Sequence, residues 1–187
     1  MPARERIASI PSEEKARAAI EDFKAQEVDY IICMFHWGSE LKYRPTDAQV
    51  ELAHACIDAG ADLIYGSHSH CLQPMERYGD GIILYSMGNW SFGGSTKPTD
   101  PDTAIFQLKI RRDGDGSIHN DSYEIIPCCV SSDLEGAANN VDNYNDYKPT
   151  PYEPGTEAYD RAMSKILGTY EGDDMVRDYS DIYASYS

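Results

Sequence analysis

Three of the five histidines in this chain stand directly after short apolar segments. His68 and His70 belong to the sequence GSHSH at 66–70, and His36 opens the sequence HWGSE at 36–40. Imidazole is the commonest side-chain metal ligand, and α/β proteins build their sites from residues that follow strands. The pattern predicts a metal site formed by His36, His68 and His70; the alternative is that the histidines of 66–70 are only solvated loop residues.

Two further polar residues, Glu40 and Asn89, lie in segments that are candidates for the same site. Glu40 lies close enough to His36 in the sequence to accept a hydrogen bond from an imidazole or to act as a base, although an ordinary surface glutamate would look the same. Asn89 lies in the glycine-rich segment 86–94, either as a polar group lining the pocket or as a left-handed turn residue. An active site here would use Glu40 and Asn89 as its catalytic residues.

Hydrophobic periodicity predicts the elements that position these residues. The segment 12–27 is predicted to be a helix, and the apolar run 28–35 is typical of a strand covered on both faces. A second helix begins at the capping box of 46–49 and ends at Gly60, and 61–65 is a second strand. Alternating helices and strands with short connections predict parallel neighbouring strands, so both histidine segments should lie at one sheet edge.

The next part of the chain has the signals of antiparallel strands. Segments 72–78 and 81–86 flank a Gly-Asp turn, and 103–112 alternates apolar and polar residues before 117–130 returns as a strand. The expected fold class is therefore α/β, with parallel βα units followed by antiparallel strands.

The last part of the chain is rich in Asn, Asp, Tyr, Pro and Gly. We expect 131–155 to be mostly irregular, one short helix over 157–167, and a frayed, acidic, tyrosine-rich end over 170–187. These features predict a folded domain over 1–130 and a tail over 131–187.

Composition limits the class of partner. The chain has 187 residues and a formal net charge of −16, which predicts one domain that binds neither nucleic acid nor an anionic membrane. No stretch approaches the ~20 consecutive apolar residues of a membrane span, and we expect no signal peptide in the first residues. Five cysteines without a C-x-x-C pair argue against a zinc–thiolate site.

A longer set of motifs resembles the capsule-synthesis CapA family (poly-γ-glutamate biosynthesis), a branch of the calcineurin-like metallophosphatase superfamily. The motifs are HWGSE at 36–40, Pro45 with Gln49, GADLI at 60–64, GSHSH at 66–70 with Gln73, Pro74 and Glu76, and YSMGNWSF at 85–92. Weaker similarity extends over 7–130, and it is the combination of motifs in this order that makes the resemblance specific.

The resemblance implies a four-layer α/β/β/α metallophosphatase-like sandwich, of which this chain would be the C-terminal portion. It also implies that His36, His68 and His70 are ligands of a divalent metal (zinc, manganese or iron), with Glu40 and Asn89 near the same pocket. The family's Asp-containing, Asn-Leu-Glu and Asn-Asn-His motifs, which would complete a two-metal centre, are not found in this sequence. The alternative is that this fragment holds no metal.

The resemblance further implies a role in capsule or poly-γ-glutamate biosynthesis, with a site that acts on a phosphoester or related ester. Two alternatives stay open: a non-catalytic, surface-associated accessory or scaffold protein, and half of a hydrolase completed by another chain. That second chain would be a homodimer partner or the missing N-terminal half. The expected partners are the capsule polymer or its synthesis machinery, and the expected location is the cell envelope, outside the cytoplasmic membrane.

Overall fold

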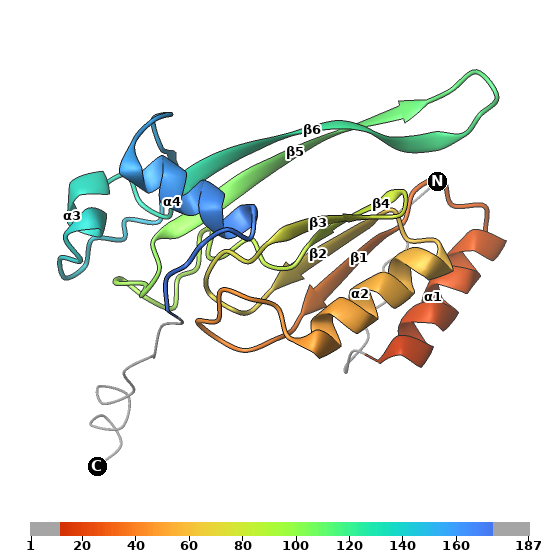
Figure 1. The fold of residues 1–187 in the computed structure, drawn as a ribbon, viewed down its shortest axis with the longest axis horizontal. Helices are drawn as coiled ribbons and strands as arrows, with labels where there is room; N and C mark the ends of the chain where they lie inside the picture. The colour runs from red at the N-terminus through yellow and green to blue at the C-terminus, as the bar shows by residue number, and fades with distance from the viewer. Residues whose placement is uncertain (1–11, 174–187) are drawn as a thin grey trace, which may run out of the picture.

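The computed structural model describes residues 12–173, which form two β-sheets and flanking helices (Figure 1). The elements in chain order are α1 Glu13–Ala25, β1 Ile32–His36, α2 Asp47–Ala59, β2 Leu63–Ser67, β3 Met75–Tyr78, β4 Gly81–Leu84, β5 Asp102–Arg112, β6 Ile118–Cys129, α3 Leu134–Ala138, β7 Thr150–Pro151 and α4 Glu157–Ile166. The expected mixed α/β class is therefore confirmed.

The first sheet has the strand order β1-β2-β4-β3. Strands β1 and β2 are parallel, which confirms the prediction that places both histidine segments at one edge. Strand β4 forms the predicted hairpin with β3, but it also runs parallel to β2, so the expectation of a purely antiparallel second half is wrong for this strand. The reason is position: all four residues of β4 are buried, as in a central strand covered on both faces.

The second sheet has the order β5-β6-β7 and is antiparallel throughout. The long β5–β6 hairpin follows the predicted alternation, with Ala104 buried and Phe106 and Leu108 packed against the core. The register shifts between Lys109 and Ile110, and Ile110 is exposed. The tip of the hairpin, at the right of Figure 1, therefore adds little to the core.

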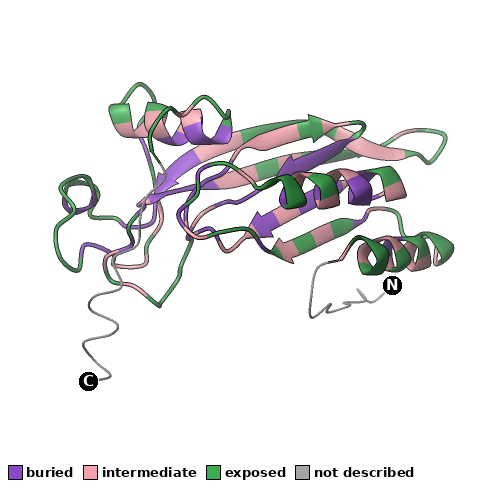
Figure 2. Cartoon of the chain, turned by 60° about the horizontal axis from the view of Figure 1, so that its bottom comes forward, coloured by how far each residue is buried: buried purple, intermediate pink, exposed green. Residues whose placement is uncertain are grey.

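The first sheet separates two hydrophobic cores. Buried residues, purple in Figure 2, are concentrated in the strands and in parts of the helices. Ile64 and Ile83 face the helices α1 and α2, where Ile20 and Cys56 pack, among others. The alternate residues Leu63, Ile82 and Leu84 face the second sheet. The period of two in a strand explains this division, because successive side chains point to opposite faces.

Capping residues fix the ends of the helices that flank the site. The side chain of Ser12 accepts a hydrogen bond from the backbone N–H of Lys15 at the start of α1. The predicted capping box of α2 is present between Thr46 and Gln49, and Gly60 ends that helix in the left-handed conformation, with φ 110°. Both predicted helices are confirmed.

The C-terminal part of the described chain packs onto the rest of the molecule. The helix expected over 157–167 is present as α4, whose Ala162 and Ile166 enter the core between the sheets together with Tyr144 and Tyr152. Of the end predicted to be frayed, 174–187 lie outside the described residues, and the division at residue 130 stays a prediction. No helix in 12–173 is long and apolar enough to cross a membrane.

Candidate metal centre

The two histidine segments meet at the carboxyl ends of β1 and β2. His36 is the last residue of β1 and pairs in register with Ser67, so His68 follows directly on the neighbouring strand. The ring centroids of His36 and His68 are 4.5 Å apart. Parallel pairing therefore brings together side chains that are 32 residues apart in the sequence, as the alternation of helices and strands predicted.

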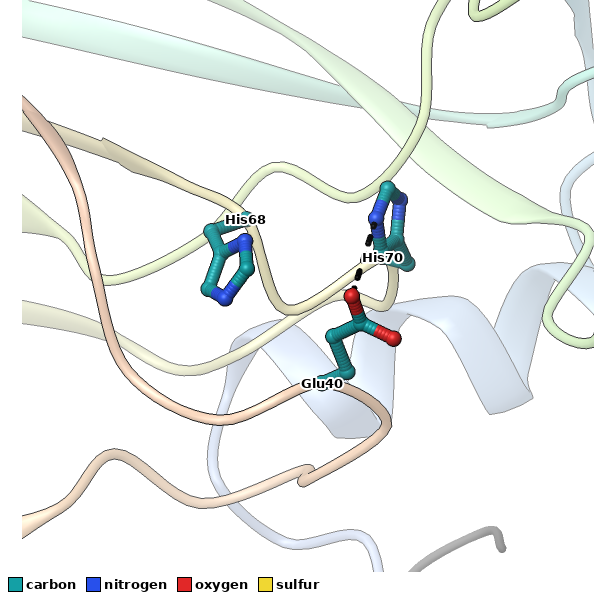
Figure 3. Close-up of side chains that lie close together, drawn as sticks. All are labelled: Glu40, His68 and His70. Carbon is teal, nitrogen blue, oxygen red and sulfur yellow. Dashed lines mark ion pairs between the residues drawn. The ribbon is translucent and has the colours of Figure 1, made fainter. Parts of the chain in front are cut away.

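Glu40, His68 and His70 form a compact group of ligand atoms (Figure 3). One nitrogen or oxygen atom from each lies within 4.8 Å of the others, and Nε2 of His70 is 3.9 Å from Oε1 of Glu40. His36 is not part of this group and lies beside the ring of His68 instead. The structure thus places Glu40 among the candidate ligands, where the sequence suggested a base or a hydrogen-bond acceptor.

Asn89 fixes the orientation of the His70 ring. Nδ1 of His70 is 2.7 Å from Oδ1 of Asn89, and the amide nitrogen of Asn89 donates to the backbone carbonyl of His70 at 3.4 Å. An amide oxygen only accepts, so Nδ1 is the donor in this contact, and Nε2 is the ring nitrogen that faces Glu40. Asn89 is buried, so it supports the His70 ring from inside the protein.

The loop that carries the histidines has an unusual backbone. His68 and His70 both have positive φ angles, 104° and 56°, in the region that favours glycine. Just before them, a Cβ atom on Gly66 would collide with the carbonyl oxygen of Tyr85 and the indole nitrogen of Trp37. That space is used by a buried hydrogen bond of 2.9 Å from Trp37 Nε1 to the Tyr85 carbonyl. Gly66 is therefore required for the Trp37 indole to pass over β2 and reach the Tyr85 carbonyl.

Buried glutamines hold the loop after β1, which carries Glu40, against the histidine loop. The backbone N–H of Leu41 donates to the carbonyl of Ser69 at 2.7 Å. The side chain of Gln73 donates to the carbonyl of Lys42 at 2.8 Å, and it accepts at 3.1 Å from Gln49 of α2. No role for Gln73 was predicted from the sequence; its position in the Gln73-Pro74 motif of the CapA resemblance was the only available signal.

The site favours neutral imidazole at His68. Burial lowers the pKa of His68, and the neighbouring His36 lowers it further, while the charge of Glu40 acts in the opposite direction. A neutral imidazole is the form that binds a metal. Two imidazoles and one carboxylate are a donor set that suits zinc, iron or manganese, so the residues present fit such an ion. Within residues 12–173, no other three such side chains come together in this way.

Comparison with known proteins gives one family match that includes the residues of this site, and several similar proteins. Residues 2–93 match the sequence model of the bacterial capsule synthesis protein PGA_cap family. The chain is 37% identical over 111 residues to the PGA biosynthesis protein CapA of Bacillus subtilis (strain 168), covering 58% of this chain and 29% of that protein. It is 40% identical over 94 residues to the capsule biosynthesis protein CapA of Bacillus anthracis, covering 50% and 23%.

A relative that matches over a shorter stretch has a different description. The chain is 41% identical over 61 residues to a probable polyglutamine synthesis accessory protein of Mycobacterium tuberculosis (strain ATCC 25618 / H37Rv), covering 33% of this chain and 16% of that protein. The chain thus spans less than a third of the length of each of these relatives. The resemblance predicted from the motifs is confirmed.

Proposed function

We propose that the chain, whose residues 2–93 match the sequence model of the bacterial capsule synthesis protein PGA_cap family, holds part of a metal-dependent phosphoesterase-type site used in capsule or poly-γ-glutamate synthesis. The observation that supports this most directly is the group formed by Glu40, His68 and His70, whose ligand atoms lie within 4.8 Å of one another. In this proposal these three residues bind one divalent ion, with His36 beside them as a further candidate ligand.

The chemistry of such a site divides between the ion and the side chains. A bound divalent ion acts as a Lewis acid and lowers the pKa of a water molecule toward neutrality. Asn89 keeps the His70 ring in the orientation that a ligand needs, and the exposed His36 faces solvent next to His68. The chain has a formal net charge of −16, so a cation at this edge would offset the repulsion of an anionic ester.

The proposal is tested by metal binding to tag-free protein. We expect isothermal titration with Zn²⁺ or Co²⁺ to show one site in the wild type and no such site in the His68→Ala/His70→Ala variant. The matched control is His54→Ala/His119→Ala, which removes two histidines outside the group and should bind as the wild type does. Equal binding by both variants would contradict the proposal. Hydrolysis of a nitrophenyl phosphodiester, lost with the metal, would extend it to catalysis.

A second candidate, a site completed by another polypeptide, is supported by strand β1. This strand ends the first sheet, and among the described residues only β2 pairs with it. Its side chains Ile32 and Met34 are 53% and 73% exposed, although both are apolar, so the expectation of a strand covered on both faces is wrong for β1. An open strand edge with apolar residues favours addition of a further strand. A strand added parallel to β1 would end beside His36 and could bring further carboxylate ligands to the site.

Self-association tests the simplest form of this candidate. If a second copy covers β1, Met34→Lys should convert an associated protein to a monomer in sedimentation velocity. Val141→Lys, at another exposed apolar residue, is the control that should leave the association unchanged. A wild-type monomer at micromolar concentration would rule out the second copy.

Metal binding without hydrolysis would instead favour an accessory protein at the cell envelope that acts on the capsule polymer or its synthesis machinery.

A further inference from the structure

A cluster of four charged side chains, three of them buried, lies outside the candidate ligand group. Asp100, Asp102 and Lys165 are at most 2% exposed. The ammonium group of Lys165 donates to both oxygens of Asp100, at 2.9 and 2.8 Å, and to Asp102 at 2.7 Å. Arg161 donates to both oxygens of Asp102, at 2.9 and 2.7 Å, and the hydroxyl of Tyr152 donates to the same carboxylate at 2.8 Å. The cluster joins helix α4 to the start of β5.

The cluster contacts the loop that carries Glu40. Nζ of Lys165 lies 4.7 Å from the centroid of the Tyr43 ring, within the range of a cation–π interaction. Tyr43 is buried in the same loop as Glu40, and this loop is tied to the histidine loop by the bond from Leu41 to Ser69. Lys165 therefore packs directly behind the segment that presents Glu40.

The cluster also contacts the loop that carries Asn89. The backbone of Gly88 bridges to that of Thr103, and the hydroxyl of Thr103 donates to the carbonyl of Met87 at 2.9 Å. Gly88 approaches the chain so closely that a Cβ atom there would lie 2.8 Å from the carbonyl oxygen of Asp102. Asp102 thus connects the charged cluster to the turn that orients His70 through Asn89.

We propose that Lys165 is a positioning residue for the candidate site: through Asp100, Asp102 and Tyr43 it fixes the two loops that present Glu40 and Asn89. Helix α4 lies outside the 2–93 family match, so in this proposal the C-terminal segment is an integral part of the site's support. The effect of Lys165 on metal affinity rests on the proposed function, whereas its effect on the loops does not.

The energetics make the cluster sensitive to the loss of one partner. Burial alone would raise the pKa of Asp102, but hydrogen bonds from Arg161 and the charge of Lys165 hold it below its usual value. Removing one member of a buried ionic group leaves the others without compensation, whereas removing a pair together leaves no orphaned charge. A variant that loses both Lys165 and its partner Asp100 therefore separates positioning from simple destabilisation.

The test is backbone hydrogen exchange in the full chain, without metal, for Lys165→Met and for Asp100→Asn/Lys165→Met. We expect the amides of Leu41, Gln73 and Gly88 to exchange at least about tenfold faster in both variants. If the single variant does not fold, the double variant still tests the proposal. A parallel Co²⁺ titration should show a weaker site in the double variant than in the wild type.

The control for global destabilisation is Ile20→Ala, which creates a cavity in the core on the helix side of the first sheet. If the amides of Leu41, Gln73 and Gly88 exchange faster in the Lys165 variants but not in Ile20→Ala, the result supports a positioning role of Lys165. If exchange of these amides is unchanged in the double variant, or rises equally in Ile20→Ala, the positioning role is overturned. A wild type that binds no Co²⁺ contradicts the proposed function, while the exchange comparison still decides the role of Lys165.

Discussion

Gly66 is the residue at which the packing behind the histidine loop is least tolerant of change. A methyl group there would meet the Tyr85 carbonyl and displace the Trp37 indole from its buried hydrogen bond. We expect Gly66→Ala to lower the free energy of unfolding by about 1–3 kcal/mol, the usual cost of overpacking a well-packed core. Urea denaturation measures this value. Gly93→Ala is the control, because nothing lies within 4 Å of its added methyl group, and equal effects would contradict the argument.

Asn89 offers a test that depends on orientation and not on ligand number. Asn89→Ala removes the acceptor for Nδ1 of His70 while leaving Glu40, His68 and His70 in place. Loss of such a supporting hydrogen bond typically weakens metal affinity by about 10–100-fold, and we expect a loss in that range for Co²⁺. Asn139→Ala, at an exposed asparagine after α3, should leave the affinity unchanged. Wild-type affinity in Asn89→Ala would show that Asn89 does not orient the ring.

The residues of the site were predictable from the sequence only in part. The approach of His36 to His68 followed from parallel strands, because both residues stand at strand ends. The place of Glu40 could not be derived in that way. It depends on the path of the loop after β1, which is set by the buried Gln73 and by single backbone hydrogen bonds such as that of Leu41. Such contacts leave no periodic signal in the sequence.

Among the elements, α2 has the clearest local signal and the most direct link to the site. Its capping box satisfies backbone donors at the N-terminus, and Gln49 of that box also holds Gln73 beneath the site loops. We expect Thr46→Ala to reduce the free energy of unfolding by about 1 kcal/mol, the usual cost of losing a cap. Thr99→Ala, at an exposed threonine, is the control for urea denaturation. Equal stability of the two variants would contradict a role of the cap.

Strand β4 shows where prediction of elements from the sequence stops. The Gly-Asp turn correctly indicated pairing with β3, because a tight turn joins antiparallel neighbours. The parallel pairing of β4 with β2 depends on the path of the segment between β2 and β3. The apolar sequence of β4 suits a strand with neighbours on both sides, but it does not identify them.

At the scale of the whole molecule, Tyr30 connects the two sheets at the end opposite the site. Its hydroxyl donates to Oδ1 of Asn120 on β6 at 2.6 Å, and Asn120 in turn donates to the carbonyl of Asp62 at 3.2 Å. Burial and the nearby charge of Asp62 raise the pKa of Tyr30 from its ordinary value of 10.0 to about 12. The folded protein therefore favours the neutral phenol more than the unfolded chain does.

The sign of the pH dependence follows from this difference. Below about pH 10 the phenol is neutral in both states, whereas between about pH 10 and 12 the unfolded chain loses its proton first. The free energy of unfolding should therefore fall as the pH rises through this interval, and Tyr30→Phe should fall less steeply. Tyr123→Phe, at an exposed tyrosine, is the control in denaturation curves measured from pH 9 to 12. Parallel slopes for Tyr30→Phe and the wild type would contradict the assignment.

The overall α/β class could be read from alternating elements, but the contribution of the C-terminal part could not. Tyr144 and Tyr152 are buried, and their hydroxyls donate to the carbonyl of Pro98 and to Asp102. The composition of this part is typical of irregular surface segments, and its buried tyrosines show no periodicity. Their polar tips are satisfied only by partners distant in sequence, which the sequence alone does not reveal.

The left-handed backbone at His68 and His70 has a consequence for how such a chain would change under selection. Glycine adopts these φ angles without a Cβ penalty, whereas histidine does so at a cost of about 1–3 kcal/mol per residue. A mutant library screened only for thermal stability should therefore drift toward glycine at both positions. Under the proposed function, the same library screened for metal binding should retain histidine, so the two screens would separate the demands of folding from those of the proposed site.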